Sequence, residues 1–211
     1  MLSKQKIESI FSTWRSQNPE PQTELIYHNG FELLIAVILS AQATDISVNK
    51  ITPRLFEEAP TAEKLAKLSI EEISEIIRSI GLYPTKAKNI KKCSQQLIEN
   101  FGGQIPKKRE QLESLAGVGR KTAGVVMNVL FQEKSIPVDT HVFRVSNRLG
   151  LVKSNNFLTV EKLLLKRVPG WALGKAHHWL ILHGRYVCKA RKPNCEACNI
   201  KNYCEYFAKN H

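Results

Sequence analysis

The chain of 211 residues is 43% hydrophobic and 24% charged, which fits one large folded domain or two small ones and argues against disorder. Its 31 lysine and arginine residues against 19 aspartate and glutamate residues give a formal net charge of +12 at pH 7, which favours a polyanionic partner. DNA or RNA is a better candidate than a membrane, although a basic surface without such a partner has the same composition.

No segment of the sequence is suited to crossing a membrane. The longest apolar run, residues 31–41, is interrupted by Glu32 and is too short to span a bilayer. The first residues lack the apolar core and the small-residue cleavage site of a signal peptide. We therefore expect a cytosolic protein without a membrane partner.

The first third of the chain shows apolar residues at helical spacing. Residues 7–14 carry one apolar face, and residues 31–39 predict a largely buried second helix. Thr44 or Asp45 can cap a third helix, in which Pro53 predicts a kink or an early stop.

The middle of the chain continues the helical pattern. Ser69 and Glu72 form a capping box that opens one helix, and Gly81 ends it. Pro84 suits the first turn of the next helix, which leaves Leu82 at the tip between the two. The helix that starts at Pro84 is expected to carry four lysines on the face opposite its apolar residues: Lys86, Lys88, Lys91 and Lys92. Further helices are expected from Asp139 or Thr140 onward, over residues 157–168 and over residues 171–187. Because no segment alternates apolar and polar residues as a strand would, the sequence predicts an all-α fold with short connections.

Residues 115–123, Leu-Ala-Gly-Val-Gly-Arg-Lys-Thr-Ala, lie between two further segments with helical apolar spacing, residues 110–115 and residues 123–130. Gly117 and Gly119 permit positive φ and a close approach of a ligand to the backbone. The helix that follows begins with unpaired N–H groups, the positive end of its dipole, Arg120 and Lys121. Such a corner suits one phosphate of a nucleic acid, whereas two glycines taken alone also fit a plain helix–helix turn.

This stretch resembles the helix-hairpin-helix of DNA repair glycosylases, and most closely their endonuclease III branch. That branch usually has proline, which stiffens the hairpin, where this chain has Ala116. The resemblance runs from the stretch Ser-Ala-Gln-Ala-Thr-Asp at residues 40–45 to the last cysteine. It implies two helical domains flanking a cleft: a six-helix barrel of residues 22–133 that ends in the hairpin, and a second domain formed by residues 1–21 and 134–211.

Four of the five cysteines lie close together near the C-terminus, spaced C-x6-C-x2-C-x5-C: Cys188, Cys195, Cys198 and Cys204. In a reducing compartment such a group indicates a metal rather than disulfides, and either tetrahedral zinc or an iron-sulfur cluster fits four thiolates. Structural zinc usually takes two C-x2-4-C pairs, and this chain has one. The spacing resembles the [4Fe-4S] loop of endonuclease III and of related adenine glycosylases, which implies that all four cysteines are cluster ligands.

The loop between the first two of these cysteines is basic. Lys189, Arg191 and Lys192 are either solvated charges or a rigid grip on DNA phosphates, and the neighbouring motifs favour the grip. Cys93, which stands alone, is expected to be a buried or half-buried unreactive thiol. The histidines of the last long helix are expected to pack or to face solvent: His177, His178 and His183.

Asp139 and Lys121 are the residues to which the resemblance gives catalytic roles. Asp139 alone would be an ordinary helix cap, but the resemblance implies a carboxylate that stabilises the charge developing on the sugar as the base leaves. Lys121 would attack C1′ through its amine, whose unprotonated form the helix dipole, Arg120 and partial burial favour. The resulting Schiff base permits β-elimination on the 3′ side. A simple phosphate contact is the alternative role for Lys121.

A base inside a duplex must be flipped out before such chemistry, and the gap must be filled. The resemblance implies that Leu82 is the wedge and that Gln42 fills the space opposite the orphaned base. Their alternatives are a packed leucine and a surface amide. His141 either contacts the abasic backbone or caps its helix.

The function implied by the resemblance is a bifunctional DNA glycosylase/AP lyase of base excision repair that acts on oxidised pyrimidines. Its partner would be duplex DNA with a damaged base or an abasic site, and we expect a monomer in the cytoplasm, associated with the nucleoid. Two alternatives stay open: a monofunctional or mismatch-specific glycosylase of the same fold, and a non-catalytic DNA-binding module with a structural or redox cluster.

Overall fold

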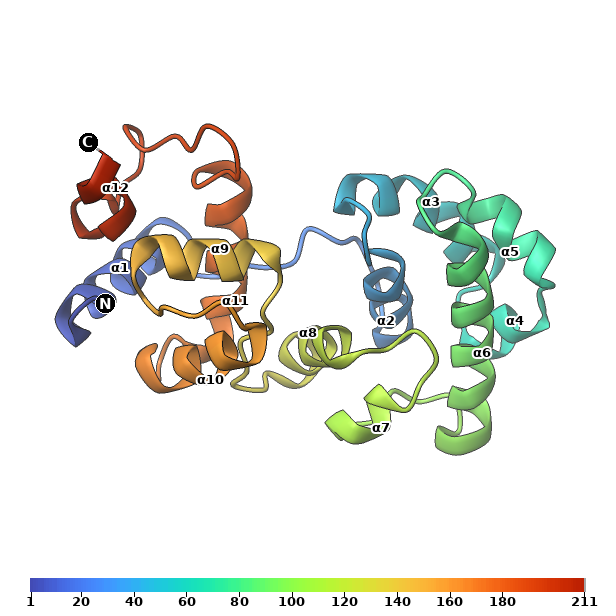
Figure 1. Cartoon of the computed structure of the whole chain (residues 1–211). Helices are drawn as coiled ribbons and strands as arrows, with labels where there is room; N and C mark the ends of the chain where they lie inside the picture. The colour runs from blue at the N-terminus through green and yellow to red at the C-terminus, as the bar shows by residue number, and fades with distance from the viewer. Residues whose placement is uncertain (211) are drawn as a thin grey trace. The chain divides into compact units, whose positions relative to one another are not determined.

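The computed structural model describes residues 1–210, and these residues form helices and connecting loops without any strand (Figure 1). The elements are α1 (Lys4–Gln17), α2 (Gly30–Leu39), α3 (Asp45–Glu58), α4 (Ala62–Lys67), α5 (Ile70–Ile77), α6 (Tyr83–Phe101), α7 (Arg109–Glu113), α8 (Arg120–Phe131), α9 (Thr140–Leu149), α10 (Phe157–Arg167), α11 (Leu173–Tyr186), the 3-10 helix η1 (Lys201–Tyr203) and α12 (Glu205–Asn210). The all-α prediction is confirmed. Among the described residues, no helix combines the length and the apolar character needed to cross a membrane.

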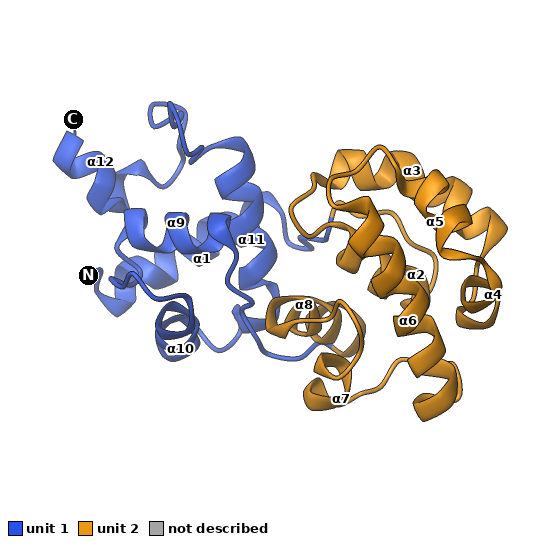
Figure 2. Ribbon diagram, turned by 45° about the vertical axis from the view of Figure 1, so that its right-hand side comes forward, with its two compact units in different colours: residues 1–23, 132–211 blue, residues 24–131 orange. Residues whose placement is uncertain are grey.

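The chain divides into two compact units, each with its own hydrophobic core (Figure 2). Unit 1 consists of Met1–Thr23 and Gln132–His211, and unit 2 consists of Glu24–Phe131. The two cores share no residue, and we describe each unit by itself.

Unit 2 is built around α2. All residues from Phe31 to Leu39 are buried, so this helix is covered on every side rather than on one face. The chain reaches its first turn through Asn29, whose side chain accepts a hydrogen bond of 2.9 Å from the backbone N–H of Glu32. α8, α3 and α6 pack against α2, and the hairpin that precedes α8 is thereby fixed to the centre of the unit.

α6 packs against α4 and α5 in unit 2 (Figures 1 and 2). The expected basic face is partly wrong, because Lys86 is buried on the core side of α6, one turn before Ile90. Burial lowers the pKa of the Lys86 amine, and Nζ makes no hydrogen bond within the described part of the chain. Lys91 is also occupied, since its Nζ donates to the carbonyls of Ala66, at 2.7 Å, and Leu68 at the end of α4. Only Lys88 and Lys92 of the four are exposed.

Proline 53 does not end its helix. α3 runs from Asp45 to Glu58 with Pro53 inside it, so the expected early stop is wrong. The capping box is confirmed: Ser69 Oγ accepts from the N–H of Glu72 at 3.1 Å, and the Glu72 carboxylate accepts from the N–H of Ser69 at 2.7 Å.

Unit 1 joins the N-terminal helix to the C-terminal part of the chain. Phe11 of α1 lies with its ring centroid 5.2 Å from that of Trp14 and 6.1 Å from that of Trp179 on α11. α11 also packs closely on α9: a Cβ added at Gly184 would lie 3.0 Å from Cβ of His141 and 3.1 Å from Cγ2 of Val145. The start of α9, where Asp139 lies, is therefore held by α11.

Candidate functional site

The hairpin between α7 and α8 is shaped by Gly117. Its φ is +77°, and an added Cβ would lie 3.0 Å from Cβ of Asn89 and 3.1 Å from Cγ2 of Ile38. Both the dihedral angle and the space therefore require glycine at this position. Gly119 differs, because an added Cβ would meet no atom within 4 Å. Val118 between them is buried and anchors the turn in the core of unit 2.

This difference gives a stability prediction for the two hairpin glycines. Gly117→Ala should lower the free energy of unfolding by about 1–3 kcal/mol, because it combines a positive φ with overpacking. Gly119→Ala is the matched control and should leave that free energy nearly unchanged. Urea unfolding followed by circular dichroism measures both, and equal losses in the two variants would contradict this account of the hairpin.

The first turn of α8 presents Arg120 and Lys121 to solvent. The first helical hydrogen bond runs from the N–H of Ala123 to the carbonyl of Gly119 at 2.9 Å. The backbone N–H groups that precede Ala123 in this turn do not belong to the hydrogen-bond ladder of the helix. They point toward the N-terminal end of α8, where an anion would bind. The Lys121 side chain is exposed rather than partly buried.

The loops that carry Gln42 and Leu82 are neighbours within unit 2. A Cβ added at Gly81 would lie 3.9 Å from the backbone oxygen of Gln42. Gln42 has φ of +52° and Leu82 has φ of +61°, a left-handed conformation that costs about 1–3 kcal/mol for residues other than glycine. The side chain of Leu82 is 55% exposed, so the packed-leucine alternative is wrong. Neither burial nor backbone preference accounts for a leucine here, which favours a functional role.

Strained backbone recurs at a third residue that the sequence analysis singled out. Lys192, in the basic loop, has φ of +50°. Within residues 1–210, Gln132 is the one further non-glycine residue with positive φ, and it lies where the chain passes from unit 2 to unit 1. Three of the four strained residues are thus predicted DNA contacts, a coincidence that fits the tendency of strain to collect at functional sites.

Asp139 is the N-cap of α9 and is oriented by it. Its Oδ1 accepts hydrogen bonds from the N–H of His141 at 2.9 Å and of Val142 at 2.8 Å. Its Oδ2 lies 3.5 Å from Nδ1 of His141, whose ring does not cap the helix. The Asp139 side chain as a whole is 17% exposed and is held in place by these hydrogen bonds. Lys121 belongs to unit 2 and Asp139 to unit 1.

The four C-terminal cysteines line one small cavity in unit 1, with a volume of about 20 Å³. Burial raises the pKa of the thiols of Cys198 and Cys204, and the nearby thiols of Cys188 and Cys195 raise both further. Burial also raises the pKa of the Cys195 thiol. Thiols in this setting fit a positively charged metal centre, which would stabilise the thiolates. Among residues 1–210, no three His, Cys, Asp or Glu side chains come close enough to hold one metal ion. The cluster assignment therefore rests on the shared cavity, the donor set and the family match below.

Two arginines of α9 hold the basic loop, a feature that the sequence analysis missed. Arg148 donates from Nη1 to the carbonyl of Lys189 at 2.7 Å and from Nη2 to that of Ala190 at 3.0 Å. Arg144 donates from Nε to the carbonyl of Cys188 at 3.1 Å. Because the two arginines are four residues apart, they share one face of α9, and that spacing was a usable signal. The helix that Asp139 caps thus also carries the loop.

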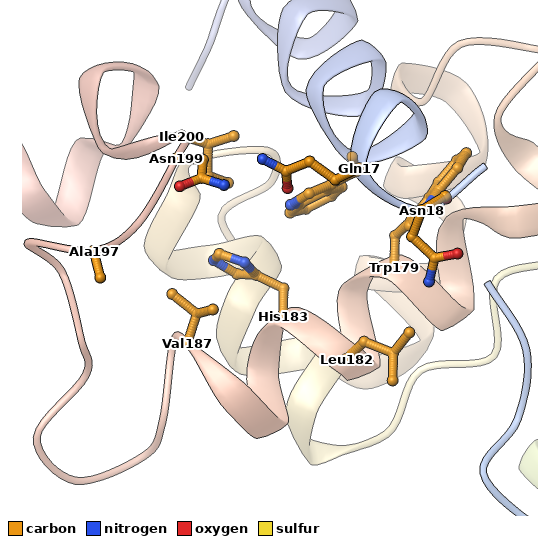
Figure 3. Close-up of a pocket in the computed structure, with 10 residues that line it drawn as sticks. Gln17, Asn18, Trp179, Leu182, His183, Val187, Ala197, Asn199 and Ile200 are labelled. Carbon is orange, nitrogen blue, oxygen red and sulfur yellow. The ribbon is translucent and has the colours of Figure 1, made fainter. Parts of the chain in front are cut away.

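His183 lies at the wall between two cavities of unit 1. It lines the cysteine cavity, where its Nε2 is 3.8 Å from Sγ of Cys198, and also a second cavity with a volume of about 200 Å³. Figure 3 shows this second cavity between the end of α1, α11 and the segment around Asn199. Burial lowers the pKa of His183 to about 4, so at neutral pH the ring is uncharged. It is a packed residue, as expected, but one that contacts a thiol.

The metal assignment predicts the composition of the purified protein. We expect a brown protein that contains iron and sulfide, and Cys198→Ala should lose most of its iron because one of the four expected ligands is removed. Cys93→Ala is the control: Cys93 is buried in unit 2, where burial raises its pKa to about 12, so iron content should not change. A colourless protein with one zinc would overturn the assignment, and elemental analysis decides it.

Comparison with known proteins places these features in a family. A family model described as HhH-GPD superfamily base excision DNA repair protein matches residues 35–170, and one described as the iron-sulfur binding domain of endonuclease III matches residues 188–204. Endonuclease III of Rickettsia prowazekii is 55% identical over 206 residues, which cover 98% of this chain and 97% of that protein. Endonuclease III of Escherichia coli K12 is 50% identical over 208 residues, 99% of each chain.

Solved structures agree with this placement. A trapped covalent intermediate of an endonuclease III with DNA superposes with a TM-score of 0.93 at 46% identity and covers 99% of both chains. A thermostable thymine-DNA glycosylase superposes with a TM-score of 0.86 at 27% identity and covers 97% of this chain and 98% of that one. The hairpin, the helical fold and the cysteine loop coincide with these matches, and the chain therefore belongs to the endonuclease III family of HhH-GPD base excision DNA repair proteins and contains that family's iron-sulfur domain.

Proposed function

We propose that the protein is a bifunctional DNA glycosylase/AP lyase of base excision repair that removes oxidised pyrimidines from duplex DNA and then cleaves 3′ to the abasic site. The observation that carries the proposal is an exposed lysine, Lys121, in the first turn of α8 directly after the hairpin. The covalent protein–DNA intermediate of the related endonuclease III supports it, because a glycosylase that activates water forms no such bond.

Lys121 is the proposed nucleophile and Asp139 the proposed electrostatic partner. The unprotonated amine forms a bond to C1′ while the bond between C1′ and the base breaks, and the base leaves with the bonding electron pair and takes up a proton. The Asp139 carboxylate stabilises the positive charge that develops on the sugar. Ring opening gives an imine, which makes the C2′ proton acidic. Loss of that proton breaks the C3′–O bond and releases the 3′ phosphate.

The DNA contacts that we propose come from both units. In unit 2 the hairpin at Gly117, Gly119 and Arg120 binds a phosphate, while Leu82 and Gln42 occupy the space that the flipped nucleotide leaves. In unit 1 His141 contacts the abasic backbone, and the basic loop of Lys189, Arg191 and Lys192 binds further phosphates.

The [4Fe-4S] cluster has the four C-terminal cysteines as its proposed ligands: Cys188, Cys195, Cys198 and Cys204. When bound, it supplies a redox-active centre and joins the ends of the basic loop to the rest of unit 1. In the glycosylase chemistry the residues of this chain perform every step. We further propose that the protein acts as a monomer on damaged chromosomal DNA in the nucleoid, since one lesion requires one active site.

The proposal is tested on duplex oligonucleotides that contain one thymine glycol opposite adenine. We expect strand cleavage without alkali, with a 3′ unsaturated aldehyde at the break. The similarity to a thymine-DNA glycosylase motivates a second substrate, a T:G mismatch, on which a mismatch-specific enzyme would release thymine and leave an alkali-labile site. Activity on the mismatch alone would replace the proposal by that alternative. Binding to damaged DNA without any base release would indicate a non-catalytic module.

A further inference from the structure

The polypeptide just before Gly117 is held by a side chain from another helix. Gln96 of α6 accepts a hydrogen bond through Oε1 from the backbone N–H of Ala116 at 2.7 Å. Its Nε2 donates to the carbonyl of Ser114 at 3.4 Å. One amide group therefore bridges two backbone groups of the segment that leads into the hairpin.

A second residue of α6 touches the same turn. Asn89 provides the atom nearest to a Cβ added at Gly117, and Gln96 follows it by two helical turns on the same face. α6 thus contacts the hairpin at Ser114, Ala116 and Gly117. Asn89 limits the space at the turn, whereas Gln96 satisfies backbone hydrogen bonds.

The residue at position 116 makes this contact necessary. A proline at this position would fix φ and would have no N–H group. Alanine frees φ and adds a donor that is half-buried against α6 and requires an acceptor. The Gln96 amide supplies that acceptor, and its second hydrogen bond restrains the same segment.

We propose that Gln96 is a positioning residue for the DNA-binding hairpin, and that its amide gives the segment before Gly117 a stiffness that Ala116 by itself does not provide. The inference rests on the proposed function for the DNA that the hairpin binds. These two hydrogen bonds of Gln96, which we call the Gln96 clamp, do not depend on that function, because they exist in the protein without DNA.

The first measurement is amide hydrogen exchange in the protein without DNA. The Ala116 N–H should be protected in the wild type and in Gln96→Glu, whose carboxylate still accepts, and it should exchange about 3- to 10-fold faster in Gln96→Leu. Gln95→Ala is the matched control, because Gln95 is the exposed neighbour on α6. Unchanged exchange in Gln96→Leu would overturn the clamp, whatever the protein does to DNA.

The second measurement is a double-mutant cycle on binding to a duplex with an uncleavable tetrahydrofuran abasic analogue. Gln96→Leu should weaken binding about 3- to 10-fold in the wild-type background. In the Ala116→Pro background the same change should have almost no effect, because the donor is gone and the ring fixes φ. Equal losses in both backgrounds would show a general effect on folding and overturn the proposal. A wild type that does not bind the duplex would contradict the proposed function, while the exchange result still decides the clamp.

Discussion

Lys121→Gln is expected to abolish strand cleavage and borohydride trapping on a duplex with a single abasic site, while binding to that duplex stays within a few-fold of wild type. Borohydride reduces an imine between protein and sugar to a stable amine, so the trapped band reports the covalent step directly. Glutamine keeps the length and polarity of the side chain but cannot form an imine. We expect the loss of trapping to be complete and not graded.

Arg120→Gln is the matched control for this experiment. Arg120 is the neighbouring cation in the first turn of α8, and both side chains are exposed. Its replacement removes the proposed phosphate contact, so binding should weaken and become less dependent on salt. Trapping at saturating protein should persist. Cleavage that survives Lys121→Gln would assign the nucleophile to another amine, and the buried Lys86 would be the first to replace.

Local patterns were sufficient to predict most helices and the hairpin. The capping box at Ser69 depends on neighbouring residues alone, and the structure shows it, whereas α5 ends at Ile77 with Arg78 as its C-cap, before the predicted stop at Gly81. The hairpin depends on a glycine that needs positive φ, which Gly117 has. The short helix α4 was missed, because its 6 residues are too few for an apolar period to appear.

Tertiary packing explains where the sequence analysis was wrong. Lysine is rarely buried, so Lys86 was assigned to the basic face although its spacing from Ile90 fits the core face equally well. The backbone strain at Gln42, Leu82 and Lys192 leaves no trace in composition or periodicity. The Gln96 clamp joins residues 20 positions apart, a contact that one sequence without aligned relatives does not reveal.

Asp139→Asn should separate the two roles that the sequence left open for this residue. Asparagine caps a helix as well as aspartate does, so the two hydrogen bonds to the N–H groups of His141 and Val142 should remain. The unfolding free energy should therefore change little. The negative charge is lost, and the single-turnover rate of base release from a thymine glycol duplex should fall about 10²- to 10³-fold, by analogy with loss of one transition-state contact.

Asp139→Ala completes the comparison, because it removes the cap together with the charge. Its unfolding free energy should fall by about 1 kcal/mol, as is typical when an N-cap becomes alanine, while its rate of base release should be as low as that of Asp139→Asn. If Asp139 acted only as a cap, the asparagine variant would keep wild-type activity and the alanine variant would lose stability alone. Because the two variants share the charge loss but differ in the cap, the rate of base release reports the carboxylate and urea unfolding reports the cap. Wild-type activity in Asp139→Asn would remove Asp139 from the proposed chemistry.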